Sequence, residues 1–125
     1  MKDGVTRAQL ESLSPDPRRL EELERSGRVK GVILTVRSQE PTYHFLSRYF
    51  APWNGIPEDP VTGSAHTVLA PYWAEVLGTK EMVARQCSAR GGDLHLSLLN
   101  SERIRIAGEA IVVISGSIIM SEIDL

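Results

Sequence analysis

The chain has 125 residues, of which 42% are hydrophobic and 24% are charged, a composition typical of a soluble globular domain. This length suits one domain, which we assign to residues 1–125, and leaves little room for a second. The net charge of −2 gives no basic field for a polyanion, so we expect no nucleic-acid partner. The lone cysteine, Cys87, excludes an internal disulfide framework. A single thiol suits a reducing compartment, so we expect a cytoplasmic protein.

Residues 1–28 are rich in charge and predict an outer helical segment. Thr6 is a candidate N-cap of a first short helix, and Asp16, followed by proline, is a candidate N-cap of a second. In the second helix we expect Leu23 to face inward and Gly27 to end the helix.

Residues 29–120 predict a sheet together with one central helix. Ala51–Gly63 is expected to be a long irregular loop, and loops of that length are often functional. No apolar run is long enough to cross a bilayer, so we expect no membrane partner. Runs of β-branched and apolar residues between glycine-containing turns predict strands at Val29–Val36, Tyr43–Phe50, Met82–Ser88, Leu94–Leu98, Arg103–Ile106 and Ala110–Ile114.

The predicted central helix, residues 64–77, is apolar nearly all round. Glu75 is its only charged residue, and such a helix is usually buried. It needs apolar cover on every side, which only the surrounding strands can supply. We therefore predict an α+β fold in which an antiparallel sheet is rolled around a buried central helix.

The run Glu58–His66 reads Glu-Asp-Pro-Val-Thr-Gly-Ser-Ala-His and leads directly into this helix. The first turn of a helix has unpaired backbone N–H groups and a partial positive charge, so it binds anions. Gly63 and Ser64 leave that end uncovered, while Asp59 can stand beside the bound group. An anion site next to an acid suits a zwitterion such as an amino acid. The alternative is structural: Thr62 or Ser64 caps the helix and Asp59 fixes the turn.

Several motifs together carry a family resemblance: Tyr49-Phe50-Ala51-Pro52, the run Glu58–His66, Tyr72-Trp73 and Arg90-Gly91-Gly92. They resemble the C-terminal half of the phenazine-biosynthesis isomerase family, whose animal members are phenazine biosynthesis-like domain proteins. The resemblance implies one lobe of a fold like that of diaminopimelate epimerase, with the active site between the helix N-termini of two lobes. It also implies that a proton is moved within a small cyclic amino acid, without a metal or an organic cofactor.

The resemblance assigns roles residue by residue. It makes Asp59 and Ser64 the catalytic candidates. Thr62 stands where related epimerases and racemases carry a catalytic cysteine, so thiol chemistry is not expected. His66 either reaches the site or packs beneath it. The candidates for binding a small carboxylate or amino-acid-like ligand are Thr62, Gly63, Ser64, Ala65 and His66.

The family's principal acid–base glutamate lies in the other lobe, so we expect these 125 residues to be inactive alone. Full family members are much longer, and the chain is expected to be a fragment or a natural short form. The alternative function is a non-catalytic binding or regulatory module. Such a module would form a homodimer, or would pair with a second lobe or a full-length homologue.

Overall fold

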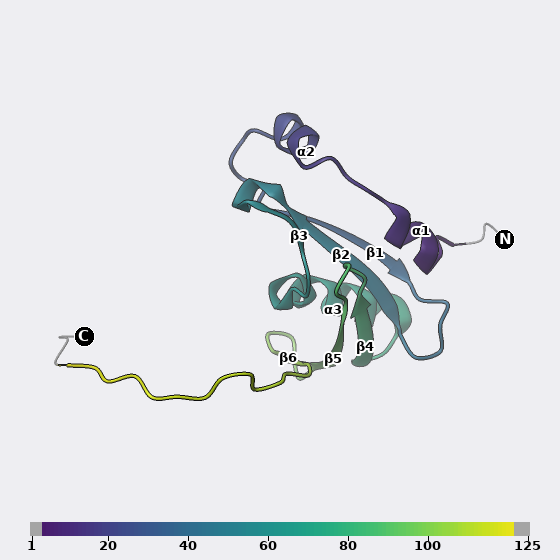
Figure 1. The fold of residues 1–125 in the computed structure, drawn as a ribbon. Coiled ribbons are helices and arrows are strands. Elements are labelled where there is room, and N and C mark those ends of the chain that lie inside the picture. Colours follow the sequence, from purple (N-terminus) through teal and green to yellow (C-terminus); the bar gives the residue numbers. More distant parts are fainter. Residues whose placement is uncertain (1–3, 122–125) are drawn as a thin grey trace.

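A computed structural model describes residues 4–121, which form three α-helices, one 3-10 turn and a six-stranded sheet (Figure 1). This mixture of helices with one sheet confirms the α+β class. The elements in chain order are α1 (Arg7–Ser12), α2 (Pro17–Leu23), β1 (Val32–Arg37), β2 (Phe45–Ala51), the 3-10 turn (Pro52–Asn54), β3 (Ile56–Asp59), α3 (Gly63–Leu77), β4 (Glu81–Gln86), β5 (Gly92–Leu98) and β6 (Ile104–Ala107).

The sheet has the strand order β1-β2-β4-β5-β6, and β3 pairs with the far end of β2. β2 and β4 run parallel, whereas the other paired strands are antiparallel. The prediction of a wholly antiparallel sheet is therefore wrong. The physical reason is the connection between the two strands: α3 carries the chain back across the sheet, so that β4 starts in the same direction as β2.

The two faces of β2 support two separate packing layers, because successive side chains of a strand point to opposite faces. Phe45 faces α3 and stacks on Trp73, with ring centroids 5.5 Å apart. Leu46 faces the other way and packs with Leu10 of α1 and with Cys87. The core under α3 consists of Phe45, Leu69, Ala70, Trp73, Met82, Ala84, Leu94 and Leu96.

α3 is buried on one side only. It starts at Gly63, one residue before the predicted start. Its outer side carries Val68, Tyr72 and Val76, each more than half exposed at 63%, 54% and 53%. The prediction of a helix buried on all sides is thus wrong for the described residues, because the sheet ends at β6 instead of continuing around the helix.

Both predicted N-caps near the N-terminus are confirmed. The Thr6 side chain accepts a hydrogen bond from a backbone N–H in the first turn of α1, and Asp16 does the same for α2. The expectations for the end of α2 are wrong. The helix ends at Leu23, which is exposed, and Gly27 lies beyond it. No residue of α2 is buried, so no core contact prolongs the helix.

Arg48 of β2 holds the N-terminal segment and β3 together. Its Nε and Nη2 donate to the two carboxylate oxygens of Glu58, at 2.7 and 2.8 Å. Its Nη1 donates to the backbone carbonyl oxygens of Leu10 and Leu13, at 2.9 and 2.6 Å. The guanidinium thus adds a hydrogen bond to the Leu10 carbonyl, which also accepts from the Leu13 N–H, and binds the Leu13 carbonyl just beyond α1.

Two other predicted segments differ from expectation. The stretch Ala51–Gly63 is not one irregular loop, since it contains the 3-10 turn and β3. Ala110–Ile114 was predicted as a strand, but residues 108–121 have no regular secondary structure and extend away from the sheet (Figure 1). We call residues 110–120 the tail. None of the described helices has the length and apolar character that crossing a membrane requires.

Candidate functional site

The candidate site forms where β3 and β4 lie along the same edge of β2. Asp59 of β3 pairs with Tyr49, and Gln86 of β4 pairs with Ser47, two residues earlier on β2. This register brings Asp59 and Gln86 together although they are far apart in sequence. The short segment between β3 and α3 then places Thr62, the N-cap residue of α3, against both of them.

Thr62 does not cap α3 with its side chain. Its backbone is extended, as an N-cap requires, but its hydroxyl donates to Oδ2 of Asp59 instead of accepting a hydrogen bond from the helix. The Ser64 hydroxyl forms no hydrogen bond with any described residue and lies in the exposed part of the first turn. The structural alternative in which one of these side chains caps the helix is therefore wrong.

Gln86 fixes the direction of the Thr62 hydroxyl. Its Oε1 accepts from the backbone N–H of Thr62 at 2.7 Å, and its Nε2 donates to Thr62 Oγ1 at 3.0 Å and to the Asp59 carbonyl at 2.8 Å. An amide nitrogen can only donate, so the Thr62 oxygen receives that bond and its own proton points to another acceptor. That acceptor is the Asp59 carboxylate. No described residue donates to the second carboxylate oxygen, Oδ1 of Asp59.

Gln86 was missed by the sequence reasoning, although a signal was present. Met82 and Ala84 are buried at alternating positions of β4, and Gln86 is the next residue on that face. A glutamine at a position where the period-2 pattern requires an apolar residue needs buried hydrogen-bond partners. Its side chain is indeed completely buried. Ser88, also missed, donates to the Pro60 carbonyl at 2.7 Å and steadies the same segment.

His66 lies beneath the site. It is completely buried, and its Nδ1 donates to the Thr62 carbonyl at 2.7 Å. Burial lowers the pKa of His66 although this hydrogen bond opposes the change, so the imidazole is neutral. Its Nε2 is then an acceptor, and it has no partner among the described residues, as is also true of Ser47 Oγ. The position agrees with the structural role that the sequence left open for His66.

The first turn of α3 is open to solvent. Gly63 and Ser64 are exposed, and a Cβ placed on Gly63 would meet nothing within 4 Å. The backbone N–H groups of Gly63, Ser64 and Ala65 precede the first intrahelical bond, and no side chain of residues 4–121 accepts from them. The Ala65 side chain is buried, so this residue can offer only its backbone. An anion can approach these three donors without displacing a cap.

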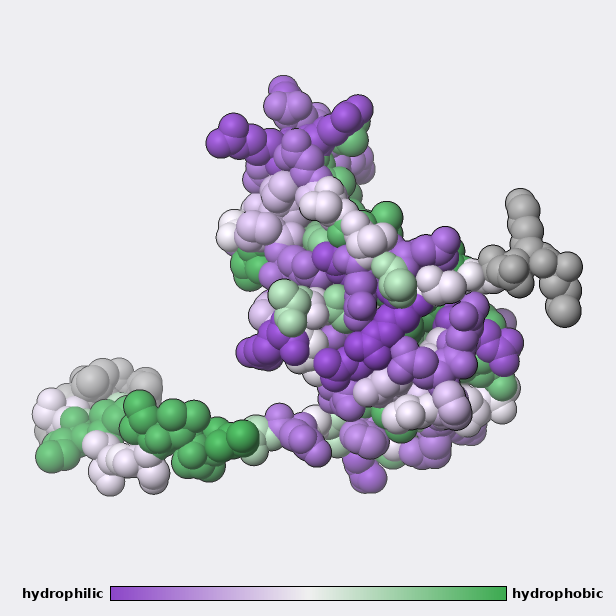
Figure 2. Space-filling model, turned by 45° about the vertical axis from the view of Figure 1, so that its right-hand side comes forward, coloured by the Kyte–Doolittle hydropathy of each residue, from purple (hydrophilic) through white to green (hydrophobic). Residues whose placement is uncertain are grey.

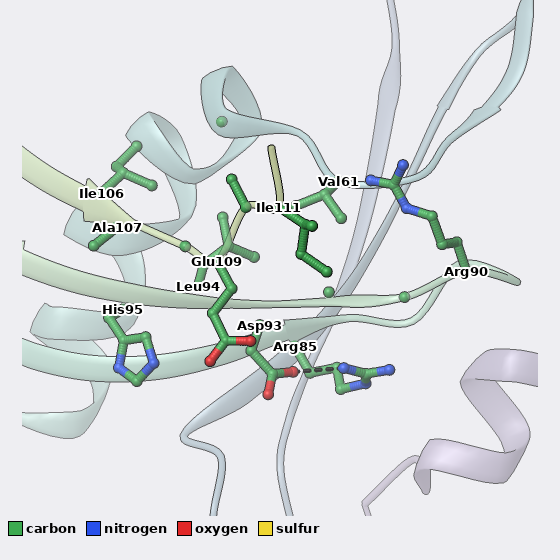
Figure 3. Close-up of a pocket in the computed structure, with 15 residues that line it drawn as sticks. Val61, Arg85, Arg90, Asp93, Leu94, His95, Ile106, Ala107, Glu109 and Ile111 are labelled. Atoms are coloured by element: carbon green, nitrogen blue, oxygen red, sulfur yellow. Dashed lines mark hydrogen bonds and ion pairs between the residues drawn. The ribbon is translucent and has the colours of Figure 1, made fainter. Parts of the chain in front are cut away.

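A hollow of about 720 Å³ opens beside this turn (Figure 3). Gly63 and Val61 line it together with the segment Arg90–Asp93, and Gly92 packs so closely on the Val61 side chain that a side chain at position 92 would require Val61 to shift. Arg90 extends toward the Val61 side of the hollow and makes no ion pair with a described residue. Of the predicted site residues only Gly63 lines this hollow, and Asp59 and Ser64 lie outside its walls.

The charges in the hollow are partly compensated. Arg85 donates to Asp93 at 2.6 Å, and the Tyr43 hydroxyl lies 3.1 Å from each carboxylate oxygen of Asp93. Burial opposes the change, but these hydrogen bonds together lower the pKa of Asp93. Among residues 4–121, Arg90 finds no ion-pair partner on the wall that Gly63 shares. Within residues 4–121, no three His, Cys, Asp or Glu side chains gather as a metal-ligand set.

The arrangement offers two chemical functions side by side. Asp59 has one carboxylate oxygen held by Thr62, and the other receives no hydrogen bond from the described part of the chain. The uncapped first turn of α3 is a site for an anionic group. The other predicted residues, Ala65 and His66, support the turn from its buried side.

Sequence comparisons connect the chain with one family. Residues 5–116 match the family model described as phenazine biosynthesis-like protein. The phenazine biosynthesis-like domain-containing protein of Rattus norvegicus is 52% identical over 120 residues, which cover 93% of this chain and 42% of that protein. An uncharacterized isomerase of Pseudomonas aeruginosa is 52% identical over 92 residues, covering 74% of this chain and 34% of that protein. The chain thus spans less than half the length of these curated relatives.

Solved structures agree with the sequence comparison. A phenazine biosynthesis PhzC/PhzF protein from Clostridium difficile has a TM-score of 0.76 at 37% identity, covering 92% of this chain and 42% of that one. A phenazine biosynthesis protein of the PhzF family from Enterococcus faecalis has a TM-score of 0.71 at 33% identity, covering 86% and 42%. The family match includes all the motifs that indicated it, from Tyr49-Phe50-Ala51-Pro52 to Arg90-Gly91-Gly92. The chain therefore belongs to the phenazine biosynthesis-like protein family.

Proposed function

We propose that these 125 residues supply one side of a cofactor-independent isomerase site that moves a proton on a small amino-acid-like carboxylate. One observation carries the proposal: the Thr62 hydroxyl is committed to Asp59, so the first turn of α3 is left uncapped and exposed beside a fixed carboxylate. The bacterial relatives described as isomerases support the reaction class.

The proposed roles follow from which groups are free. The N–H groups of Gly63 and Ser64 bind the substrate carboxylate, assisted by the positive end of the helix. Asp59 faces the ammonium or ring nitrogen side of the ligand, and its free Oδ1 accepts or returns the proton. The Ser64 hydroxyl, which has no partner among the described residues, is free to donate a hydrogen bond to the ligand.

The same proposal makes the chain inactive alone. The proposal follows the family resemblance, which implies that the principal acid–base glutamate belongs to a second lobe of a fold like that of diaminopimelate epimerase. We therefore expect the 125-residue chain to bind ligand weakly and to exchange no substrate Cα proton with deuterium in D₂O. Measurable exchange by this chain at neutral pH would contradict the proposed division of labour between two lobes.

Binding is tested by titrating the ¹⁵N-labelled chain with L-proline, glycine and sodium acetate at constant ionic strength. Two charge-assisted hydrogen bonds of about 1.5–3 kcal/mol each correspond to a dissociation constant between roughly 0.04 and 6 mM. We expect saturating shifts at the Gly63, Ser64 and Ala65 amides. The zwitterions should bind more tightly than acetate because Asp59 attracts their cationic nitrogen, and Asp59→Asn should remove that preference. No shift at these amides up to about 50 mM ligand would refute the anion site.

Gly63→Pro is a matched variant for this experiment. Gly63 is the first helical residue, where proline is favoured, and the extended backbone of Thr62 suits a residue before proline. The substitution removes one N–H donor from the turn and leaves every intrahelical bond intact. We expect weaker binding of all three ligands, with unchanged or slightly increased thermal stability. Equal affinity in the variant would show that the Gly63 amide does not contact the carboxylate.

A second candidate function is a non-catalytic binding module. The observation in its favour is the exposed apolar surface of α3 and of the tail. Exposed apolar patches of this size commonly mark interaction sites. In this case the partner would be a second copy of the chain or a full-length homologue.

A further inference from the structure

Two polar side chains with unused hydrogen-bonding atoms lie deep beneath the candidate site. Figure 2 shows a mostly hydrophilic surface on the body of the chain, where water can bond to polar groups. His66 and Ser47 are out of reach of that water, since 0% and 2% of their area is exposed. Among the described residues, His66 Nε2 and Ser47 Oγ have no hydrogen-bond partner. Buried polar atoms almost always have one, because leaving them unpaired costs free energy.

The two residues belong to one layer between the sheet and the start of α3. Ser47 lies two residues after Phe45 on β2, so both side chains point to the α3 face. The His66 ring stacks on Phe45, with ring centroids 6.0 Å apart. Gln86 is the register partner of Ser47. It bonds to the backbone N–H of Thr62, whose carbonyl accepts from His66. Ser47 and His66 therefore share their neighbours in one enclosed layer.

The unused atoms are complementary through a single water molecule. His66 Nδ1 donates to the Thr62 carbonyl and the imidazole is neutral, so Nε2 can only accept. A water can accept from the Ser47 hydroxyl and donate to Nε2, which satisfies both atoms. Its second proton can go to Gln86 Oε1, which accepts one hydrogen bond from the Thr62 N–H and can accept another. Three hydrogen bonds are the usual number for a buried water.

We propose that Ser47 and His66 hold one buried water, which anchors the His66 ring from the side opposite to Thr62. The peptide bond between Thr62 and Gly63 is planar and trans, so its carbonyl and its N–H point in opposite directions. The ring adds a buried donor to the one that the helix backbone supplies to this carbonyl. The Gly63 N–H is thereby directed to the exposed side of the turn. Ser47 is thus a positioning residue for the first turn of α3, and this role rests on the proposed function.

NMR of the complete ¹⁵N-labelled chain without ligand tests the water site directly. We expect a cross-peak between water and a carbon-bound ring proton of His66, with the sign that marks a long-lived bound water. In Ser47→Ala this cross-peak should weaken, and the ¹⁵N shift of Nε2 should move toward that of an imidazole nitrogen without a hydrogen bond. No such cross-peak in the wild type, or an unchanged Nε2 shift in Ser47→Ala, would overturn the proposal.

The sign of the stability change is a second measurement. With the proposed water, Ser47→Ala removes a hydrogen bond and should raise the equilibrium constant for unfolding in urea by roughly two- to tenfold. If the hydroxyl had no partner, its removal would relieve an unpaired buried group and lower that constant, which would contradict the proposal. Ser97→Ala is the matched control, because Ser97 lies on the opposite face of the sheet from Leu96 and bonds to Glu81. It should leave the His66 signals unchanged and alter the constant by less than about twofold.

The positioning role is read from ligand binding. In the L-proline titration, Ser47→Ala should raise the dissociation constant measured at the Gly63 and Ser64 amides at least about twofold, whereas Ser97→Ala should leave it unchanged. An unchanged constant in Ser47→Ala would refute the positioning role and leave the isomerase proposal standing. No amide shift in the wild type would refute the isomerase site and the positioning role together, while the ligand-free spectra still decide the water site.

Discussion

Gln86→Leu should destabilise the fold and release the Thr62 hydroxyl from its fixed direction. Leucine has a similar size but offers no hydrogen-bonding group. The substitution leaves the Thr62 backbone N–H and the Asp59 carbonyl without their present partner. A buried polar group that loses its partner costs about 1–3 kcal/mol. The cost for the buried Thr62 N–H should lie in the upper part of that range, whereas the half-buried Asp59 carbonyl can bond to water instead. We therefore expect the free energy of unfolding to fall by about 2–4 kcal/mol in total.

Gln86→Glu separates hydrogen bonding from shape. The introduced carboxyl can accept from the Thr62 N–H, but when ionised it faces the Asp59 carbonyl with a second acceptor. Protonation restores a donor, so folding should raise the pKa of the introduced group above its unfolded value near 4.3. The stability of this variant relative to the wild type is therefore best below pH 4.3. This relative stability is lost as the pH rises through the raised pKa that the introduced carboxyl has in the folded state.

The measurement is urea unfolding at one fixed protein concentration, since self-association would otherwise change the apparent stability. Gln39→Leu, on an exposed residue, is the control and should change the free energy of unfolding by less than about 0.5 kcal/mol. A loss below about 1 kcal/mol for Gln86→Leu, with an unchanged Thr62 amide shift, would refute the hydrogen-bond network. A pH-independent difference for Gln86→Glu would refute the donor role of Nε2.

Three further predictions use other buried groups. Arg48→Met should lower the free energy of unfolding in urea by about 3–5 kcal/mol, because it leaves the half-buried Glu58 carboxylate without its partner. The control Arg37→Met, on the exposed end of β1, should lower it by less than about 0.5 kcal/mol. Similar losses for the two variants would contradict the role given to the Arg48–Glu58 ion pair. Because burial lowers the pKa of His66, the free energy of unfolding should decrease as the pH drops below 6.5, by up to about 1.4 kcal/mol per pH unit. His66→Phe should reduce that pH dependence. An unchanged dependence in the variant would argue against a neutral buried imidazole. Burial raises the pKa of the Cys87 thiol and shields it, so Ellman's reagent should react with the native chain at least about a hundredfold more slowly than with the chain unfolded in urea. Rapid labelling of the native chain would show that the thiol is accessible.

The features that the sequence predicted correctly depend on near neighbours in the chain. Thr6 and Asp16 cap helices through bonds to N–H groups two or three residues away, which local residue types largely determine. For the same local reason, the β-branched run Val29–Val36 marked β1 and the aromatic and apolar residues of Tyr43–Phe50 marked β2. Short contiguous motifs, among them the run Glu58–His66, indicated the family, and the family match over residues 5–116 confirms it.

The remaining features required the tertiary structure, because they depend on which strand lies beside which. Gln86 meets Thr62 and Asp59 only because β3 and β4 share one edge of β2, and periodicity along a strand carries no information about that register. The parallel pairing of β2 with β4 and the exposed side of α3 have the same origin. The low net charge and the contiguous motif that leads into α3 can be read directly from the residues in order. The tertiary structure was needed to show that the Thr62 hydroxyl bonds to Asp59 and leaves the helix end open. The reason is that Gln86, which orients this hydroxyl, comes from a strand distant in sequence.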